Sequence, residues 1–120
     1  YSALFFGGTF LFGVQKIPVP GDYRVQDDFG AADRPHRFSA KDTAVVHRIE
    51  GVLRSVLQSR FGVDTLPYAR IDLLRGGDGS LYLNELEMVE PSLFFRHDPT
   101  RGARFAEVIA ERLRLGASPE

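Results

Sequence analysis

The acidic residues of the stretch LYLNELEMVEP, residues 81–91, are the side chains in this sequence best suited to chemistry. Glu85, Glu87 and Glu90 interrupt a run that is otherwise mostly apolar. A buried strand does not tolerate charged groups unless they are paired or bound to something. Carboxylate oxygens are hard ligands that suit Mg²⁺ or Mn²⁺, and Mg²⁺ commonly shares its coordination shell with substrate phosphates. The stretch is therefore a candidate for part of a metal site.

A predicted hairpin brings this stretch beside a second strand that carries charged residues. The segments YARIDLLR and SLYLNELEM flank the turn sequence GGDG, a combination typical of β-hairpins. If Arg75 and Ser80 lie opposite each other, Asp72 faces Leu83, and the alternation of side chains then fixes which residues share a face. Four charged residues are predicted to project from one face: Arg70, Asp72, Glu85 and Glu87.

Two interpretations of this charged face remain open. Three carboxylates near one arginine repel one another unless a cation is bound, which favours a metal site. The face could instead be a solvated surface of the sheet, with Arg70 as an ordinary counter-ion. In the first interpretation the metal ligands are Asp72, Glu85 and Glu87. Glu90 lies past the strand and is predicted to be structural.

Local patterns predict the strands that position these residues. Residues 3–17 are expected to form two strands, ALFF and TFLFGVQKI, joined by a tight turn at Gly7-Gly8. The segment DYRVQDDF, residues 22–29, alternates in the manner of a strand. The segment GAADRPHRF, residues 30–38, has the composition of a polar loop.

Two amphipathic helices are predicted to pack on this sheet. Ser39 is a candidate N-cap for a helix from about Ala40 to Arg60. The apolar positions of that helix are Val45, Val46, Ile49, Val52, Leu53, Val56 and Leu57. A second helix is expected from about Thr100 to Leu115. The predicted class is therefore α+β, with a largely antiparallel sheet covered by two main helices.

Size and composition narrow the classes of function. With 120 residues the chain is at most one domain. A formal charge of −1 argues against general nucleic-acid binding, and no apolar run is long enough to cross a membrane. The absence of cysteine excludes disulfides and fits a cytoplasmic location. Because the first residue is Tyr1 rather than Met and stands in a segment with the pattern of a strand, we expect the chain to be trimmed or to be the C-terminal part of something longer.

The acidic hairpin resembles the metal-binding hairpin of the ATP-grasp superfamily, which includes glutathione synthetase and the ribosomal-protein glutamate ligases. Asp72 is followed thirteen residues later by Glu85, and Glu87 stands where the family pattern Asp…Glu-x-Asn has its last member. The segments GDYRVQ and EPSLF also occur in the order that the family has. The resemblance implies that residues 1–115 are an ATP-grasp C-terminal lobe without the N-terminal lobe, and that 116–120 are a tail.

The resemblance implies a role for each matching residue. Mg²⁺ or Mn²⁺ ions bridging the phosphates of ATP would be held by Asp72, Glu85 and Glu87. The residues in contact with the nucleotide or substrate would be Lys16, Arg24, Leu74 and Asn84. Arg24 would face the γ-phosphate and Arg70 would stabilise charge on the transferred phosphoryl group, so both are candidate catalytic residues. Asn84 stands where the family often has a large apolar residue.

The reaction implied by the resemblance is ATP-dependent ligation of a small-molecule carboxylate to an amine through an acylphosphate. The family's nucleotide cleft needs an earlier lobe, so the isolated chain is expected to be inactive until that lobe completes it. Two alternatives remain. The chain could be a non-catalytic ATP-grasp remnant that acts as an interaction module or homodimer. It could also bind Mg²⁺ or phosphate without any ligation.

Overall fold

An antiparallel sheet with a helix on either side forms the part of the chain that this computed structural model describes, residues 1–18 and 32–116. The strands are β1 (Ser2–Phe6), β2 (Thr9–Ile17), β3 (Ala32–His36), β4 (Tyr68–Arg75) and β5 (Leu81–Glu87). Their order in the sheet is β3-β2-β1-β4-β5, and every neighbouring pair is antiparallel. The predicted α+β class is confirmed.

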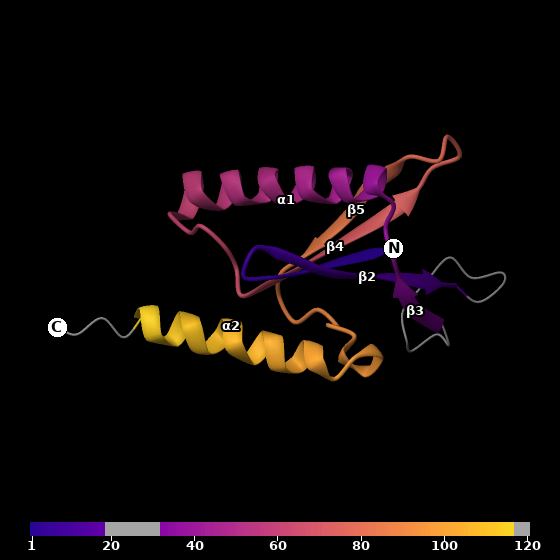
Figure 1. Ribbon diagram of the computed structural model, residues 1–120. Coiled ribbons are helices and arrows are strands. Elements are labelled where there is room, and N and C mark those ends of the chain that lie inside the picture. The colour runs from indigo at the N-terminus through magenta and orange to yellow at the C-terminus, as the bar shows by residue number, and fades with distance from the viewer. Residues whose placement is uncertain (19–31, 117–120) are drawn as a thin grey trace.

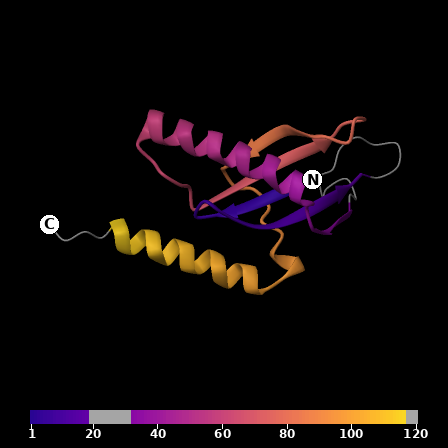
Figure 2. The same ribbon diagram turned by 45° about the horizontal axis from the view of Figure 1, so that its top comes forward.

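Two long helices and one short one complete the fold within the described residues. Helix α1 (Ala40–Phe61) and helix α2 (Thr100–Gly116) lie on opposite sides of the sheet, and the 3₁₀ helix η2 (Phe95–His97) leads into α2 (Figure 1, Figure 2). Neither α-helix combines the length and the apolar character that a membrane span requires, within the described ranges. The predicted strand at residues 22–29 and most of the predicted tail 116–120 lie outside those ranges, whereas Gly116 is the last residue of α2.

The third strand is a correction to the sequence prediction. Residues 30–38 were expected to be a polar loop, whereas Ala32–His36 pair with β2 as the edge strand of the sheet. Arg34 donates to the side-chain oxygen of Gln15 across that pair, at 2.8 and 3.0 Å. An edge strand tolerates charged residues and a proline because one of its sides forms no ladder. The segment is therefore a strand because its backbone pairs with β2, and the local sequence pattern does not predict that pairing.

The first two strands follow the prediction closely. Gly7 and Gly8 both have positive φ, +57° and +79°, as a tight hairpin turn with a matching twist requires. The turn places β1 between β2 and β4, in the middle of the sheet. All residues of β1 are buried, because helices cover both faces of the sheet there.

Helix α1 begins and ends where its sequence indicates. The Ser39 hydroxyl accepts a hydrogen bond from the Asp42 backbone N–H at 3.1 Å, and Gly62 ends the helix in the left-handed conformation. The predicted apolar stripe was too wide, since Val52 and Val56 are exposed. A single straight helix on a sheet can bury only one narrow face, and the remainder of the stripe points into solvent.

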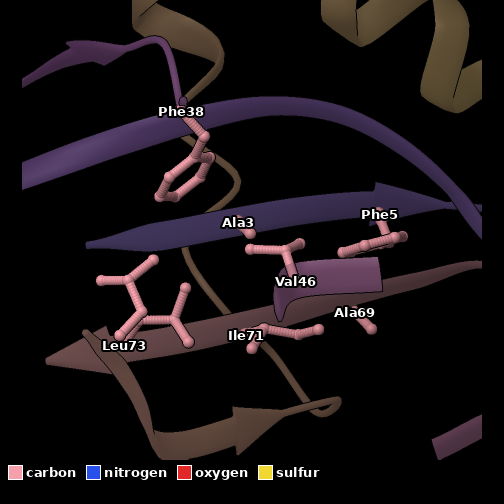
Figure 3. Packing of buried hydrophobic residues seen from close by; sticks show 8 residues of the cluster. Ala3, Phe5, Phe38, Val46, Ala69, Ile71 and Leu73 are labelled. Atoms are coloured by element: carbon pink, nitrogen blue, oxygen red, sulfur yellow. The ribbon is translucent and has the colours of Figure 1, made fainter. Parts of the chain in front are cut away.

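The main core lies between α1 and the three central strands. Figure 3 shows Val46 of α1 set against Ala3, Ile71 and their neighbours on β1 and β4. A second apolar cluster on the opposite face of the sheet contains Leu4, Phe12, Val14 and Phe94. Because both faces of β1 are packed, the side chains that share the second face are held in fixed positions.

Candidate functional site

The predicted shared face of the β4–β5 hairpin is formed, although the predicted register is wrong. Asp72 lies opposite Glu85 rather than Leu83, and Arg70 lies opposite Glu87. Two changes produce this register. The hairpin closes with Arg75 opposite Leu81, and the pairing then shifts by one residue at a bulge between the Asp72 and Leu73 pairs. The two changes together bring the acidic residues into direct opposition on one face.

Asp72 is the centre of a buried ionic network on this face. The guanidinium of Arg70 donates to both of its carboxylate oxygens at 2.9 Å. Lys16 on β2 donates to one oxygen at 2.8 Å, and the Ser2 hydroxyl donates to the other at 2.7 Å. The side chains of Asp72 and Arg70 are only 8% and 9% exposed. Three strands therefore converge on one carboxylate.

The network determines the charge state of Asp72. Burial alone raises the pKa of this carboxyl, but the hydrogen bonds from Arg70, Lys16 and Ser2 outweigh it. The net effect is a pKa of Asp72 below its ordinary value. The carboxylate is therefore ionised at neutral pH, as a metal ligand or an electrostatic anchor must be.

The two glutamates differ in their surroundings. Glu87 forms an ion pair with Arg70, so that this guanidinium bridges two carboxylates. Glu85 is exposed on the edge strand of the sheet. In the described ranges no three Asp, Glu or His side chains lie close enough together to hold a metal ion. The metal role of Asp72, Glu85 and Glu87 therefore stays a prediction.

A cavity of about 320 Å³ adjoins Asp72 and contains several of the predicted nucleotide contacts. The predicted residues that line it are Lys16, Asp72, Leu74 and Asn84. Leu74 is 59% exposed, which leaves a free apolar surface at the rim. Four residues that the sequence predicted to contact metal or nucleotide therefore line the same cavity. Arg24, the remaining predicted contact, lies outside the described residues.

Sequence reasoning missed three groups at this site. Ser2 is opposite Asp72 in the β1–β4 pairing, and the backbone carbonyl of Ser92 accepts from Arg70 at 3.3 Å. The ring of Phe94 lies below the guanidiniums of Arg70 and Arg96, at 5.7 and 5.2 Å. Phe94 also has a left-handed backbone, with φ of +52°. Ser92 and Phe94 belong to the segment EPSLF, to which the sequence assigned no role at the site, and Ser2 stands at no local spacing from the acidic hairpin.

Comparisons with known proteins find a relative that is similar in both sequence and structure. The cycloserine biosynthesis protein DcsG of Streptomyces lavendulae is 32% identical over 116 residues, which are 95% of this chain and 34% of the relative. The crystal structure of D-cycloserine synthetase DcsG is similar with a TM-score of 0.71 and 28% identity, covering 93% of this chain and 37% of that one. No protein-family model matches. The chain spans about a third of the length of the curated relative it matches, and over that third it is related to DcsG in sequence and in fold.

Proposed function

We propose that this chain is the C-terminal lobe of an ATP-grasp ligase that joins a carboxylate to an amine through an acylphosphate. The observation that carries the proposal is the direct opposition of Asp72 and Glu85 on a face that also presents Arg70 and Lys16. Carboxylates for metal ions and cations for phosphate are the groups that phosphoryl transfer requires. The similarity to a protein named D-cycloserine synthetase supports ligation as the class of reaction.

The ion pairs of Asp72 suggest how this site would take up its ligand. Both carboxylate oxygens already accept from cationic side chains, Arg70 and Lys16. A phosphate group offers those cations a stronger partner because it carries more negative charge. We therefore expect Lys16 and Arg70 to turn toward phosphate when nucleotide binds, which frees Asp72 for metal. In this proposal metal and nucleotide bind together, and neither binds well alone.

The donor set fits a magnesium–nucleotide complex in its chemistry. Asp72, Glu85 and Glu87 would supply hard oxygens, and Asp72 lines the cavity of about 320 Å³ together with Leu74 and Asn84. Bound Mg-ATP would supply an activated phosphoryl group. Arg70 would stabilise negative charge on that group, with Arg24 as a second guanidinium. The adenine and the remaining phosphates would need contacts from a further lobe.

Paramagnetic broadening in NMR spectra of the ¹⁵N-labelled chain tests the metal site. Mn²⁺ added with ATP is expected to broaden the amide signals around Asp72, Glu85 and Glu87, whereas Mn²⁺ added alone should broaden them far less. The Glu85→Gln variant should lose this local broadening, because the exposed glutamate can be changed without disturbing the core. Glu111→Gln is the matched control, since Glu111 is an exposed residue on α2.

Two results would contradict the proposal. Local broadening that is identical in the wild type and in Glu85→Gln would remove the hairpin as the metal site. Absence of broadening near β4 and β5 at any ATP concentration, in a protein that also contains the further lobe, would favour the non-catalytic interaction module. A complete ligase assay would follow on a protein that contains the further lobe, with release of ADP and phosphate as the readout.

A further inference from the structure

A second hollow lies along the outer edge of β2 and shares no lining residue with the cavity beside Asp72. Its volume is about 930 Å³, within the range of small-molecule sites. The hollow exists because β3 pairs only with Gly13–Ile17 of β2. The first residues of β2, from Thr9 to Phe12, have no strand beyond them in the part of the chain that the structure describes. We call this hollow the edge groove.

Aromatic side chains make up much of the wall of the edge groove. Phe10 and Phe38 line it from the side of α1, with ring centroids 6.1 Å apart. Phe12 lines it from the other face of the sheet. An apolar or aromatic group placed here would be removed from water against three rings, which is favourable. The groove is therefore suited to an organic ligand with a bulky apolar part.

The polar lining of the edge groove is entirely basic or neutral. Arg37, Arg101, His36 and His47 line it, and none of its lining residues is an aspartate or glutamate. The first turn of α1 also contributes, through Ala40 and Thr43. The positive end of a helix favours a negative ligand in its first turn. The basic lining of the groove therefore favours a ligand with a negative charge.

Two residues that line the edge groove, Arg101 and His36, each have a buried nitrogen atom without a hydrogen-bond partner among the described residues, Nη1 and Nε2 respectively. The Arg101 side chain is 15% exposed, and its guanidinium lies 3.4 Å from the centroid of the Phe12 ring. Its ion pair with Asp98, at 3.5 Å, engages Nε and leaves Nη1 unused. A buried donor without an acceptor costs about 1–3 kcal/mol, more when it is charged. An acceptor from a ligand would remove that cost.

We propose that the edge groove binds an organic carboxylate with an aromatic or bulky aliphatic group, whose carboxylate meets Arg101 and whose apolar part packs on Phe10, Phe12 and Phe38. Inorganic phosphate is a poorer match, because most of the lining residues are apolar and only Arg37 and Arg101 provide guanidinium groups. The site is independent of the proposed ligase function, since none of its residues belongs to the network of Asp72.

The probe for this site is 3-phenylpropionate, titrated into the ¹⁵N-labelled chain and followed by NMR. The expected dissociation constant is about 1 mM, since a ligand of this size gains a fraction of a kcal/mol per heavy atom. Amide shifts should concentrate at the start of β2 and at the N-terminal turns of α1 and α2. Arg101→Leu should weaken binding about tenfold. Arg104→Leu is the matched control on α2, because Arg104 pairs with Glu107 and does not line the groove.

A second variant tests the site without removing Arg101, whose side chain also packs on Phe12. Ala44 is exposed on α1 and lines the groove, so Ala44→Trp should fill it and abolish binding without touching the core. Glu85→Gln should bind the probe normally, which separates this site from the ligase site. The proposal is overturned if the probe does not bind, if Ala44→Trp binds it unchanged, or if 3-phenylpropanol or inorganic phosphate binds as tightly as the carboxylate.

Discussion

Arg70 donates two hydrogen bonds to the carboxylate of Asp72, its neighbour two residues further along β4, and both groups are buried. The two side chains share a face because residues i and i+2 of a strand point the same way. Lys16 adds a second positive charge to the same carboxylate from β2. A buried carboxylate with this many donors anchors the face and is held ionised.

Asp72→Asn should lower the free energy of unfolding by about 3 kcal/mol, because it removes the counter-charge of Lys16 and leaves the buried Arg70 with only the partly exposed Glu87 as an ionic partner. Urea denaturation followed by circular dichroism measures the change. Asp64→Asn is the control, since Asp64 is exposed, and it should change stability by less than about 0.5 kcal/mol. Equal stability of the two variants would mean that the network contributes nothing to the fold.

Stability should fall in acid in a way that depends on Asp72. The pKa of this carboxyl is below its ordinary value in the folded chain, so its contribution is fully present above about pH 4. That contribution is lost as the pH falls through the folded-state pKa. Urea unfolding at a series of pH values should therefore show a steeper acid decline for the wild type than for Asp72→Asn. Parallel curves would contradict the assignment.

Ser39→Ala should destabilise the chain by about 1 kcal/mol, because α1 loses the side chain that accepts from the Asp42 backbone N–H. Thermal unfolding by calorimetry gives the change. Ser55→Ala serves as the control at an exposed position inside the same helix, where alanine is the better helix former and no loss is expected. A loss of equal size in both variants would exclude the cap as the cause.

Gly13→Ala should destabilise the chain by about 2 kcal/mol. A Cβ at Gly13 would lie 2.7 Å from the His36 carbonyl oxygen and 2.6 Å from the Phe38 ring, and the carbonyl belongs to the paired strand β3 and cannot move freely. Gly51→Ala is the matched control in α1, where an added Cβ meets nothing and should stabilise the helix by up to about 1 kcal/mol. Urea midpoints of the two variants should shift in opposite directions, and a shift in the same direction would contradict this packing.

The sequence alone determined the elements whose signals are local. Gly7-Gly8 and the GGDG turn predicted both hairpins, and Ser39 and the helical spacing behind it predicted α1. The shared face of Arg70, Asp72, Glu85 and Glu87 was also predicted correctly, although from a wrong register. The pairing differs from that register at the turn and at a bulge. The two differences together shift the pairing by two residues, so the charged residues still project from the same face.

The tertiary structure alone decided which groups meet across the chain. Ser2 and Lys16 reach Asp72 because β1 lies next to β4 in the sheet and β2 lies next to β1. The strand at Ala32–His36 and the edge groove beside it likewise depend on how far β3 extends along β2. Turn and helix signals act over a few residues and can be read locally. Strand order, register and the contacts of buried charges are set by pairing between distant segments, which local pattern does not specify.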